Sequence, residues 1–374
     1  MELNSITEAI AAIANGECVV VVDDTDRENE GDLIMAAGKA TPERIGFMVR
    51  HTSGLLCVPM SQERAARLNL APMVANNLDP MRTAFTVSVD YKVGMTTGIS
   101  AEERAATARA LANDNCDASD FLRPGHMFPL IARQGGVLTR SGHTEAATDL
   151  TALAGLGEAG VLAEIVNDDG SLKRLPQLIE FAKAHALKIV TIEDLIQYRV
   201  RTEQFVECVS SRRASMGGTP VTLQVYQTPF DPMQHVVAVF GDLGDGAAVP
   251  CRIHREQPIA DLCGRAGQAR SWVEVALTQF REHGRGVLIL LRNPLAEDSV
   301  WEEASETLAD GEEHASARRR KQRWREVGIG AQILRHLGVR SIELIAAREH
   351  HYVGLGGFGI EITSTVPFET KPAK

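Results

Sequence analysis

The chain has 374 residues, of which 44% are hydrophobic and 24% charged, an ordinary composition for a globular protein of two or three domains. A formal net charge of -10 argues against a general binder of nucleic acids or membrane surfaces, because both are anionic. The chain starts without a basic signal segment, and no apolar run approaches the roughly 20 residues of a membrane span. Six scattered cysteines without a CxxC motif predict reduced thiols in a cytoplasmic protein.

Helices and strands alternate irregularly in the first 200 or so residues. Ser5 and Glu8 form a capping box that opens a helix ended by Gly16, and a buried strand follows over Glu17–Val22. Further helices are predicted from Thr41 onward and at Ser100–Leu111, Thr144–Leu153 and Leu175–His185. Strand-like runs cover Gly54–Pro59, Ala84–Val89, Val161–Ile165 and Lys188–Thr191. This order predicts an α/β or α+β domain rather than an alternating barrel.

A polar and charged segment, Arg199–Arg213, separates this region from a second one. We place the boundary near Gln204, which gives domains of residues 1–204 and 205–374. In the second domain, strands are predicted at Val221–Tyr226, Val236–Phe240 and Val287–Leu291, and helices at Ser271–His283 and Gly330–Leu337. The stretch Glu297–Arg325 is first acidic and then basic. A solvated loop with compensating charges is favoured there over a docking or phosphate-binding element.

An acidic cluster follows the first strand directly. The ten residues Asp23–Asp32 hold six carboxylates and one arginine. Carboxylates at this density repel one another unless a cation or an arginine compensates them. Oxygen ligands favour magnesium or manganese over zinc. The segment is therefore a candidate metal site, and a charged turn explains the composition equally well.

Two later turns, Arg123–His126 and Arg140–Glu145, place a histidine beside glycine and arginine. The second run offers backbone N–H groups and hydroxyls at the start of a helix, which suits a phosphate group. Arg140 would add a charge-assisted hydrogen bond. Glu164 lies within an apolar run, where desolvation would favour a general base. The alternative for Glu164 is an edge-strand residue that faces water.

Five motifs in one order carry a resemblance to a known family. They are Asp23–Asp32, Thr83–Val87, Thr96–Ala101, Arg123–His126 and Arg140–Ala146. On these motifs, about the first 200 residues resemble 3,4-dihydroxy-2-butanone 4-phosphate synthase of riboflavin biosynthesis. The resemblance implies conversion of D-ribulose 5-phosphate to L-3,4-dihydroxy-2-butanone 4-phosphate and formate with magnesium or manganese. The implied route runs through a metal-stabilised enediolate, a skeletal rearrangement and formate loss.

The same resemblance implies roles for individual residues. Glu28 and His143 would bind the metal, and His126 and Glu164 would be the catalytic residues that transfer protons. Substrate contacts would come from Arg27, Glu28, Asp32, Arg140, Ser141, Gly142, His143, Thr144 and Glu164. Thr97 and Cys57 are further neighbours of the site, although Thr97 could instead cap a turn and Cys57 could lie in the core. Family members are homodimers with sites near the subunit interface, so a homodimer is implied.

The second domain resembles GTP cyclohydrolase II in its short motifs, which are Arg252–His254, Gly328–Leu334, Leu337–Val339 and Tyr352–Leu355. That family binds zinc through a C-x10-C-x-C pattern. Here the three positions hold Gln257, Gln268 and Arg270, so no zinc is expected.

Other family features of the second domain are also replaced. Arg292–Glu297 stands where the family has a glycine-rich segment, Arg323 where it has an acidic residue and Val327 where it has a tyrosine, while the catalytic arginine remains as Arg325. We therefore predict an inactive domain and favour a structural role over nucleotide sensing. The alternatives for the whole chain are a bifunctional enzyme that retains GTP cyclohydrolase II activity and a non-catalytic regulatory or scaffold protein. The intact polar set of the first domain argues against the last.

Overall fold

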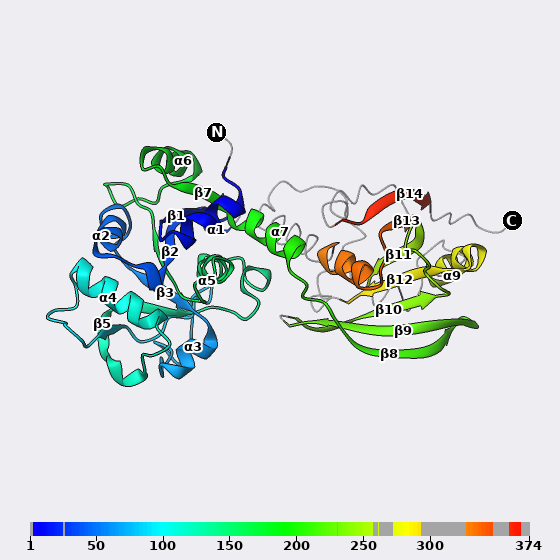
Figure 1. Ribbon diagram of the computed structural model, residues 1–374, viewed down its shortest axis with the longest axis horizontal. Coiled ribbons are helices and arrows are strands. Elements are labelled where there is room, and N and C mark those ends of the chain that lie inside the picture. Colours follow the sequence, from blue (N-terminus) through cyan, green and yellow to red (C-terminus); the bar gives the residue numbers. More distant parts are fainter. Residues whose placement is uncertain are drawn as a thin grey trace. The chain divides into compact units, whose positions relative to one another are not determined.

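The structure is a computed structural model that describes residues 3–24, 27–229, 231–256, 261, 272–292, 327–346 and 359–367. Two compact units divide the chain, Met1–Tyr198 and Arg199–Lys374. Each unit is built around one seven-stranded mixed sheet (Figure 1), so the predicted mixed α/β architecture is confirmed. Within the described residues, no helix is long and apolar enough to cross a membrane.

The sheet of the first unit has the strand order β4-β5-β3-β6-β2-β1-β7. Its strands are β1 (Val19–Val22), β2 (Gly31–Ala36), β3 (Cys57–Met60), β4 (Val89–Tyr91), β5 (Phe121–Ile131), β6 (Gly160–Glu164) and β7 (Lys188–Thr191). Its helices are α1 (Ile6–Ala14), α2 (Pro42–His51), α3 (Gln62–Arg67), α4 (Ala101–Ala112), α5 (His143–Leu153), α6 (Leu175–Ala184) and α7 (Ile192–Thr202). Short 3-10 turns are η1 (Ala37–Lys39), η2 (Ala118–Asp120) and η3 (Gly136–Leu138).

The two faces of this sheet are covered by different helices. Val20, Val22, Leu33 and Met35 form a core with residues of α2, α4 and α6. Helix α5 contacts β1, β2, β3 and β6 and also packs on α1. Because side chains alternate between the faces of a strand, the neighbours of these core residues, Asp32 among them, project toward α5.

The sheet of the second unit has the order β14-β13-β11-β12-β10-β9-β8. Its elements are β8 (Glu207–Met216), β9 (Thr219–Thr228), β10 (Asp231–Phe240), β11 (Val249–Arg255), α9 (Trp272–His283), β12 (Gly286–Leu291), a helix at 327–336, β13 (Ser341–Ala346) and β14 (Glu361–Pro367). Strands β8, β9, β10 and β12 pair antiparallel, and β12, β11, β13 and β14 pair parallel. Phe280 of α9 is fully buried in the core against β9 and β12 residues.

Most predicted helices of the first domain are confirmed. Ser5 and Glu8 make the capping box of α1, and the Thr41 side chain accepts the Arg44 N–H at the start of α2. One expectation is wrong. The run Ala84–Val89 is mostly irregular, with β4 starting only at its last residue. The polar segment Arg199–Arg213, which separates the two regions of the sequence, includes the end of α7 and part of β8. The charged stretch 297–325 lies outside the described residues.

Candidate metal centre and active site

The acidic loop between β1 and β2 folds around the carboxylate of Asp23. This side chain is 1% exposed and accepts the backbone N–H groups of Glu28 at 3.0 Å and Glu30 at 2.9 Å. Arg27 Nη1 donates to the same carboxylate at 3.0 Å and also pairs with Glu28. One buried carboxylate thus organises the loop and fixes the backbone of Glu28.

The sheet register places Asp32 next to Glu164. Asp32 of β2 pairs with Glu164 of β6 on one side and with Val21 of β1 on the other. His143 begins α5, and its Nε2 lies 3.1 Å from the Val21 carbonyl oxygen. A carbonyl oxygen can only accept, so the neutral ring carries its proton on Nε2 and keeps the Nδ1 lone pair for a ligand.

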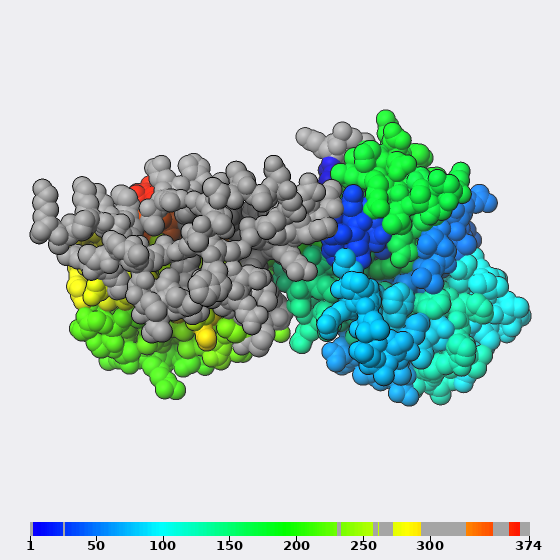
Figure 2. Space-filling model, turned by 180° about the vertical axis from the view of Figure 1, so that it is seen from behind, coloured from blue at the N-terminus to red at the C-terminus, as the bar shows by residue number. Residues whose placement is uncertain are grey.

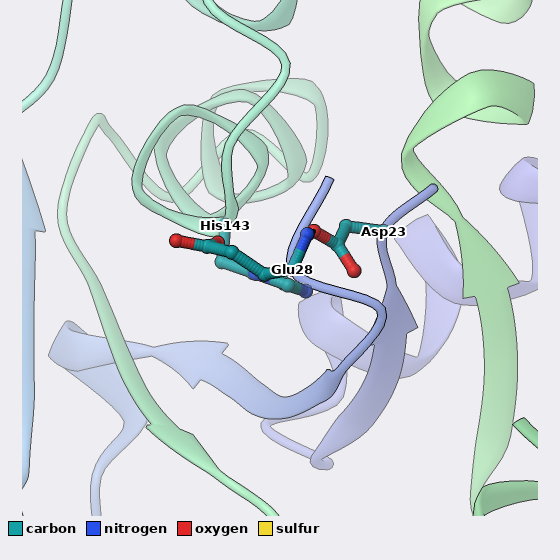
Figure 3. Close-up of side chains that lie close together, drawn as sticks. All are labelled: Asp23, Glu28 and His143. Carbon is teal, nitrogen blue, oxygen red and sulfur yellow. The ribbon is translucent and has the colours of Figure 1, made fainter. Parts of the chain in front are cut away.

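Two overlapping groups of potential ligands share His143. Asp23, Glu28 and His143 each have a ligand atom within 4.8 Å of the others, and so do Glu30, Asp32 and His143. Figure 3 shows the first group, with Asp23 at the end of β1, Glu28 in the loop and His143 at the start of α5. Carboxylate oxygens with one imidazole nitrogen are a donor set suited to magnesium or manganese.

The electrostatics of the cluster also suit a cation. Burial, reinforced by repulsion from Glu164 and Glu30, raises the pKa of Asp32 well above its usual range, and Asp32 Oδ1 has no hydrogen-bond partner among the described residues. Burial and neighbouring carboxylates likewise raise the pKa of Glu30 to about 7. Burial lowers the pKa of His143 to about 4, which keeps its ring neutral and able to bind a metal near pH 7. A bound divalent cation would relieve the repulsion among these carboxylates.

His126 forms a separate group with Asp90. The Asp90 carboxylate accepts the His126 backbone N–H at 2.9 Å and lies 2.7 Å from His126 Nδ1. The Asp90 side chain is 5% exposed, whereas that of His126 is 41% exposed. Gly98 packs on this pair, since a Cβ there would lie 2.2 Å from Asp90 Oδ2. Asp90 therefore places a proton on Nδ1 and leaves Nε2 available at the surface.

The expected phosphate-binding turn is ordered by side-chain contacts. Arg140 Nη1 donates to Glu145 Oε2 at 2.7 Å, and Arg140 Nη2 donates to Thr83 Oγ1 at 3.3 Å. Ser141 is half-buried, whereas Gly142 is buried, as is Thr144 in the first turn of α5. This first turn carries N–H groups without partners inside the helix, the usual setting for an anion.

The structure brings together Arg27, Glu28, Asp32 and His143, and it pairs Glu164 with Asp32. Cys57 of β3 is buried and pairs with Leu162 of β6, the strand that carries Glu164, and burial, followed by Glu164 and Asp32, raises the pKa of its thiol. Sequence reasoning missed Asp90 and Ser53, the hydrogen-bond partners of His126 and Glu164. They are separated from those partners by 36 and 111 positions, so no local motif could have identified them.

In the second unit, His254 of the Arg-x-His motif is tied to structural neighbours. Its Nε2 lies 2.8 Å from Asp261 Oδ1, and its ring stacks on Trp272 with centroids 3.7 Å apart. Trp272 Nε1 also donates to Asp261 Oδ1 at 2.9 Å. Cys251 is fully buried, and burial raises the pKa of its thiol to about 12. The positions that replace the zinc ligands, Gln257, Gln268 and Arg270, lie outside the described residues, as do Cys263, Arg323 and Arg325.

Two protein families match the chain in succession. Residues 7–198 match the family described as 3,4-dihydroxy-2-butanone 4-phosphate synthase, and residues 207–367 match the family described as GTP cyclohydrolase II. The "Monofunctional riboflavin biosynthesis protein RIBA 2, chloroplastic" of Arabidopsis thaliana is 45% identical over 370 residues, 98% of this chain and 78% of the relative. The "Bifunctional riboflavin biosynthesis protein RIBA 1, chloroplastic" of the same plant is 45% identical over 377 residues, covering 97% and 69%.

Two solved structures are also similar. The crystal structure of "RibBX, a two domain 3,4-dihydroxy-2-butanone 4-phosphate synthase from A. baumannii" has a TM-score of 0.77 and 35% identity, and it covers 97% of this chain and 99% of that chain. A 3,4-dihydroxy-2-butanone 4-phosphate synthase solved "in complex with two Magnesium ions" has a TM-score of 0.52 and 46% identity, covering 54% and 98%.

Proposed function

Because the chain belongs to the 3,4-dihydroxy-2-butanone 4-phosphate synthase family and is thus an enzyme of riboflavin biosynthesis, we propose that it converts D-ribulose 5-phosphate to L-3,4-dihydroxy-2-butanone 4-phosphate and formate. Residues 1–204 would form the synthase domain and residues 205–374 the second domain. The observation that carries this proposal is the meeting of Glu28, Asp32 and His143 in one acidic cluster beside Glu164.

Glu28 and His143 would hold a magnesium or manganese ion. When bound, this ion supplies positive charge that stabilises developing negative charge on substrate oxygens. Glu164 projects from the same sheet face as Asp32, so its carboxylate lies on the substrate side of the sheet. There it takes a proton from the carbon next to the substrate ketone. His126, oriented by Asp90, exchanges protons through Nε2. Arg27 and Asp32 bind the sugar hydroxyls, while Arg140, Ser141, Gly142 and Thr144 receive the phosphate at the start of α5.

We propose a homodimer, because the first unit exposes many large apolar side chains. Of the nine large hydrophobic side chains exposed among the described residues, eight belong to the first unit. Ile99 follows Gly98, which packs on the Asp90–His126 pair, and Leu122 lies on the same strand as His126. Met73, Val74, Leu78 and Met81 lie in a segment coloured light blue on the surface in Figure 2. A second copy of the chain would cover such a surface and complete the site around His126.

We propose that the second domain lacks GTP cyclohydrolase II activity. The replaced zinc positions support this, and so does Cys251, whose burial disfavours the thiolate that zinc requires. The stacked Trp272 covers His254, the remaining family histidine.

The five cysteines among the described residues are free thiols, which supports a cytoplasmic protein.

Formate release tests the proposed function directly. Purified protein with magnesium and D-ribulose 5-phosphate is expected to release formate, and Glu28→Ala and His143→Ala are expected to abolish the release. Incubation with GTP and zinc is expected to yield no ring-opened pyrimidine. If the wild-type protein released no formate from the sugar phosphate, a non-catalytic protein would be favoured. Any pyrimidine product from GTP would establish the bifunctional alternative.

A further inference from the structure

Ser53 is bonded to Glu164 at both its backbone and its side chain. The Ser53 backbone N–H donates to the Glu164 carbonyl oxygen at 2.8 Å, and the Ser53 hydroxyl donates to Glu164 Oε2 at 2.7 Å. The hydroxyl oxygen in turn accepts the Leu55 N–H at 3.3 Å, so its own proton is directed at the carboxylate. Oε2 of Glu164 is thereby held by Ser53, and Oε1 can take a proton from the substrate.

An irregular segment of chain places Ser53 against Glu164. Thr52 pairs with Ile165 and Cys57 with Leu162, so residues 53–56 on one side face only residues 163 and 164 on the other. Extra residues of this kind form a bulge, which redirects side chains at the edge of a regular pairing. Here the bulge directs the Ser53 hydroxyl to the carboxylate.

The bulge is itself held by hydrogen bonds on both sides. The Thr52 hydroxyl donates to the Met48 carbonyl oxygen at 2.7 Å, near the end of α2, and accepts the Gly54 N–H at 3.2 Å. The buried Arg104 of α4 donates to the Gly54 carbonyl oxygen at 3.4 Å. Gly54 has φ +77°, a conformation that favours glycine. These hydrogen bonds fix the backbone on both sides of Ser53.

We propose that Ser53 is a positioning residue for Glu164 in the synthase reaction. Its hydroxyl holds the carboxylate in one orientation beside Asp32, which stands opposite. This inference rests on the proposed role of Glu164 in proton transfer.

The kinetic test compares Ser53→Ala with Ser53→Thr, which keeps a hydroxyl. Ser53→Ala is expected to lower kcat for formate release about tenfold. KM and the affinity for Mn²⁺ should remain those of the wild type, and Ser53→Thr should restore kcat. Ser53→Gly, which also lacks the hydroxyl, replaces the alanine variant if that variant does not fold.

Ser5→Ala is the matched control. Ser5 also donates its hydroxyl to a glutamate carboxylate, Glu8 Oε2 at 3.0 Å, but it does so at the capping box of α1. This control loses a serine–glutamate hydrogen bond elsewhere in the same unit and should leave kcat unchanged. A kcat of Ser53→Ala equal to that of Ser5→Ala would overturn the proposal.

A second readout does not depend on turnover. In protein labelled with ¹³C at the glutamate carboxyl carbons, the signal absent from Glu164→Gln reports Glu164. The chemical shift of this signal is expected to change in Ser53→Ala, which lacks the hydrogen bond to Glu164 Oε2, and to remain that of the wild type in Ser53→Thr. An unchanged chemical shift in Ser53→Ala would refute the role of Ser53. Absence of formate release would refute the proposed function instead, so the two failures are distinguishable.

Discussion

Asp32 and Glu164 stand directly opposite each other in the antiparallel pair of β2 and β6, so two carboxylates project from one face of the sheet. Asp32 is 2% exposed, and its Oδ1 has no hydrogen-bond partner among the described residues. Burial and the nearby carboxylates raise the pKa of Asp32, so its ionised form lowers the stability of the folded protein. The metal-free protein must fold against this repulsion, and a bound cation would remove it.

Asp32→Asn should therefore stabilise the metal-free protein while weakening metal binding. The substitution removes one buried negative charge, and we expect the free energy of unfolding at pH 7 to rise by about 1 kcal/mol. Urea unfolding with a chelator measures this change, and a Mn²⁺ titration measures the loss of affinity. Asp169→Asn on an exposed loop is the control, because nearby Ser171 hydrogen bonds lower the pKa of Asp169. Destabilisation of metal-free Asp32→Asn would contradict this account of the cluster.

Gly125→Ala should impair the role of His126 and also lower the stability of the fold. A Cβ at Gly125 would lie 2.0 Å from the Val89 carbonyl carbon and 2.3 Å from the Asp90 backbone nitrogen, so the backbone around Asp90 must move. We expect a stability loss of about 2 kcal/mol and a fall in kcat of at least tenfold. Thermal unfolding and formate release, measured on the same preparation, check both. Normal kcat in a folded Gly125→Ala protein would show that the Asp90–His126 geometry is dispensable.

The pH dependence of stability should include a contribution from His51. This residue ends α2 and packs in an aromatic cluster with Phe47, Phe181 and His185, its ring centroid lying 4.7 Å from that of His185. Burial, then His185, Arg50 and Lys173, lower the pKa of His51, while Asp168 acts in the opposite direction.

Because the folded-state pKa of His51 lies below its unfolded value, the stabilisation is present above about pH 6.5 and is lost as the pH falls through the folded pKa. Urea unfolding at pH 7.5 and pH 5.5 should therefore show a smaller difference for His51→Gln than for the wild type. His185→Gln, which removes the facing ring, should change the difference in the same direction. Equal differences for all three proteins would exclude this contribution.

The proposed dimer predicts that a charge on its apolar surface separates the subunits. Ile99 is 52% exposed and Leu122 is 41% exposed, so Ile99→Asp and Leu122→Asp should leave the monomer folded. Light scattering should show a dimer for the wild type and a monomer for the variants, with a loss of formate release. Val209→Asp in the second unit is the control and should remain dimeric. A monomeric wild type with full activity would contradict the dimer.

The local signals in the sequence predicted five of the seven helices of the first unit, all but α3 and α7. Capping residues such as Ser5, Thr41 and Ser100 act on the first turn of their own helix, so their effect is independent of distant contacts. The pairing of the strands was much harder to predict from the sequence. Strand β2 was missed because its six residues, Gly31–Ala36, are all buried and show no alternation of polar and apolar side chains.

The candidate site was predictable only through its motifs. The acidic segment, the glycine–histidine turns and Glu164 are visible in the sequence, but nothing local shows that Asp32 pairs with Glu164 or that Asp23 organises the loop. Asp90 and Ser53 have ordinary sequence surroundings, and only the fold brings them to His126 and Glu164. Residues that hold other site residues therefore had to be found in the structure.

An anomalous difference map from crystals soaked with Mn²⁺ would show which residues of the protein hold the metal. We expect a strong peak coordinated by Glu28 and His143, with D-ribulose 5-phosphate beside it when the sugar phosphate is added. Crystals of Glu28→Ala treated in the same way should lack the peak. A wild-type peak at other residues, in crystals of protein that releases formate, would contradict the account.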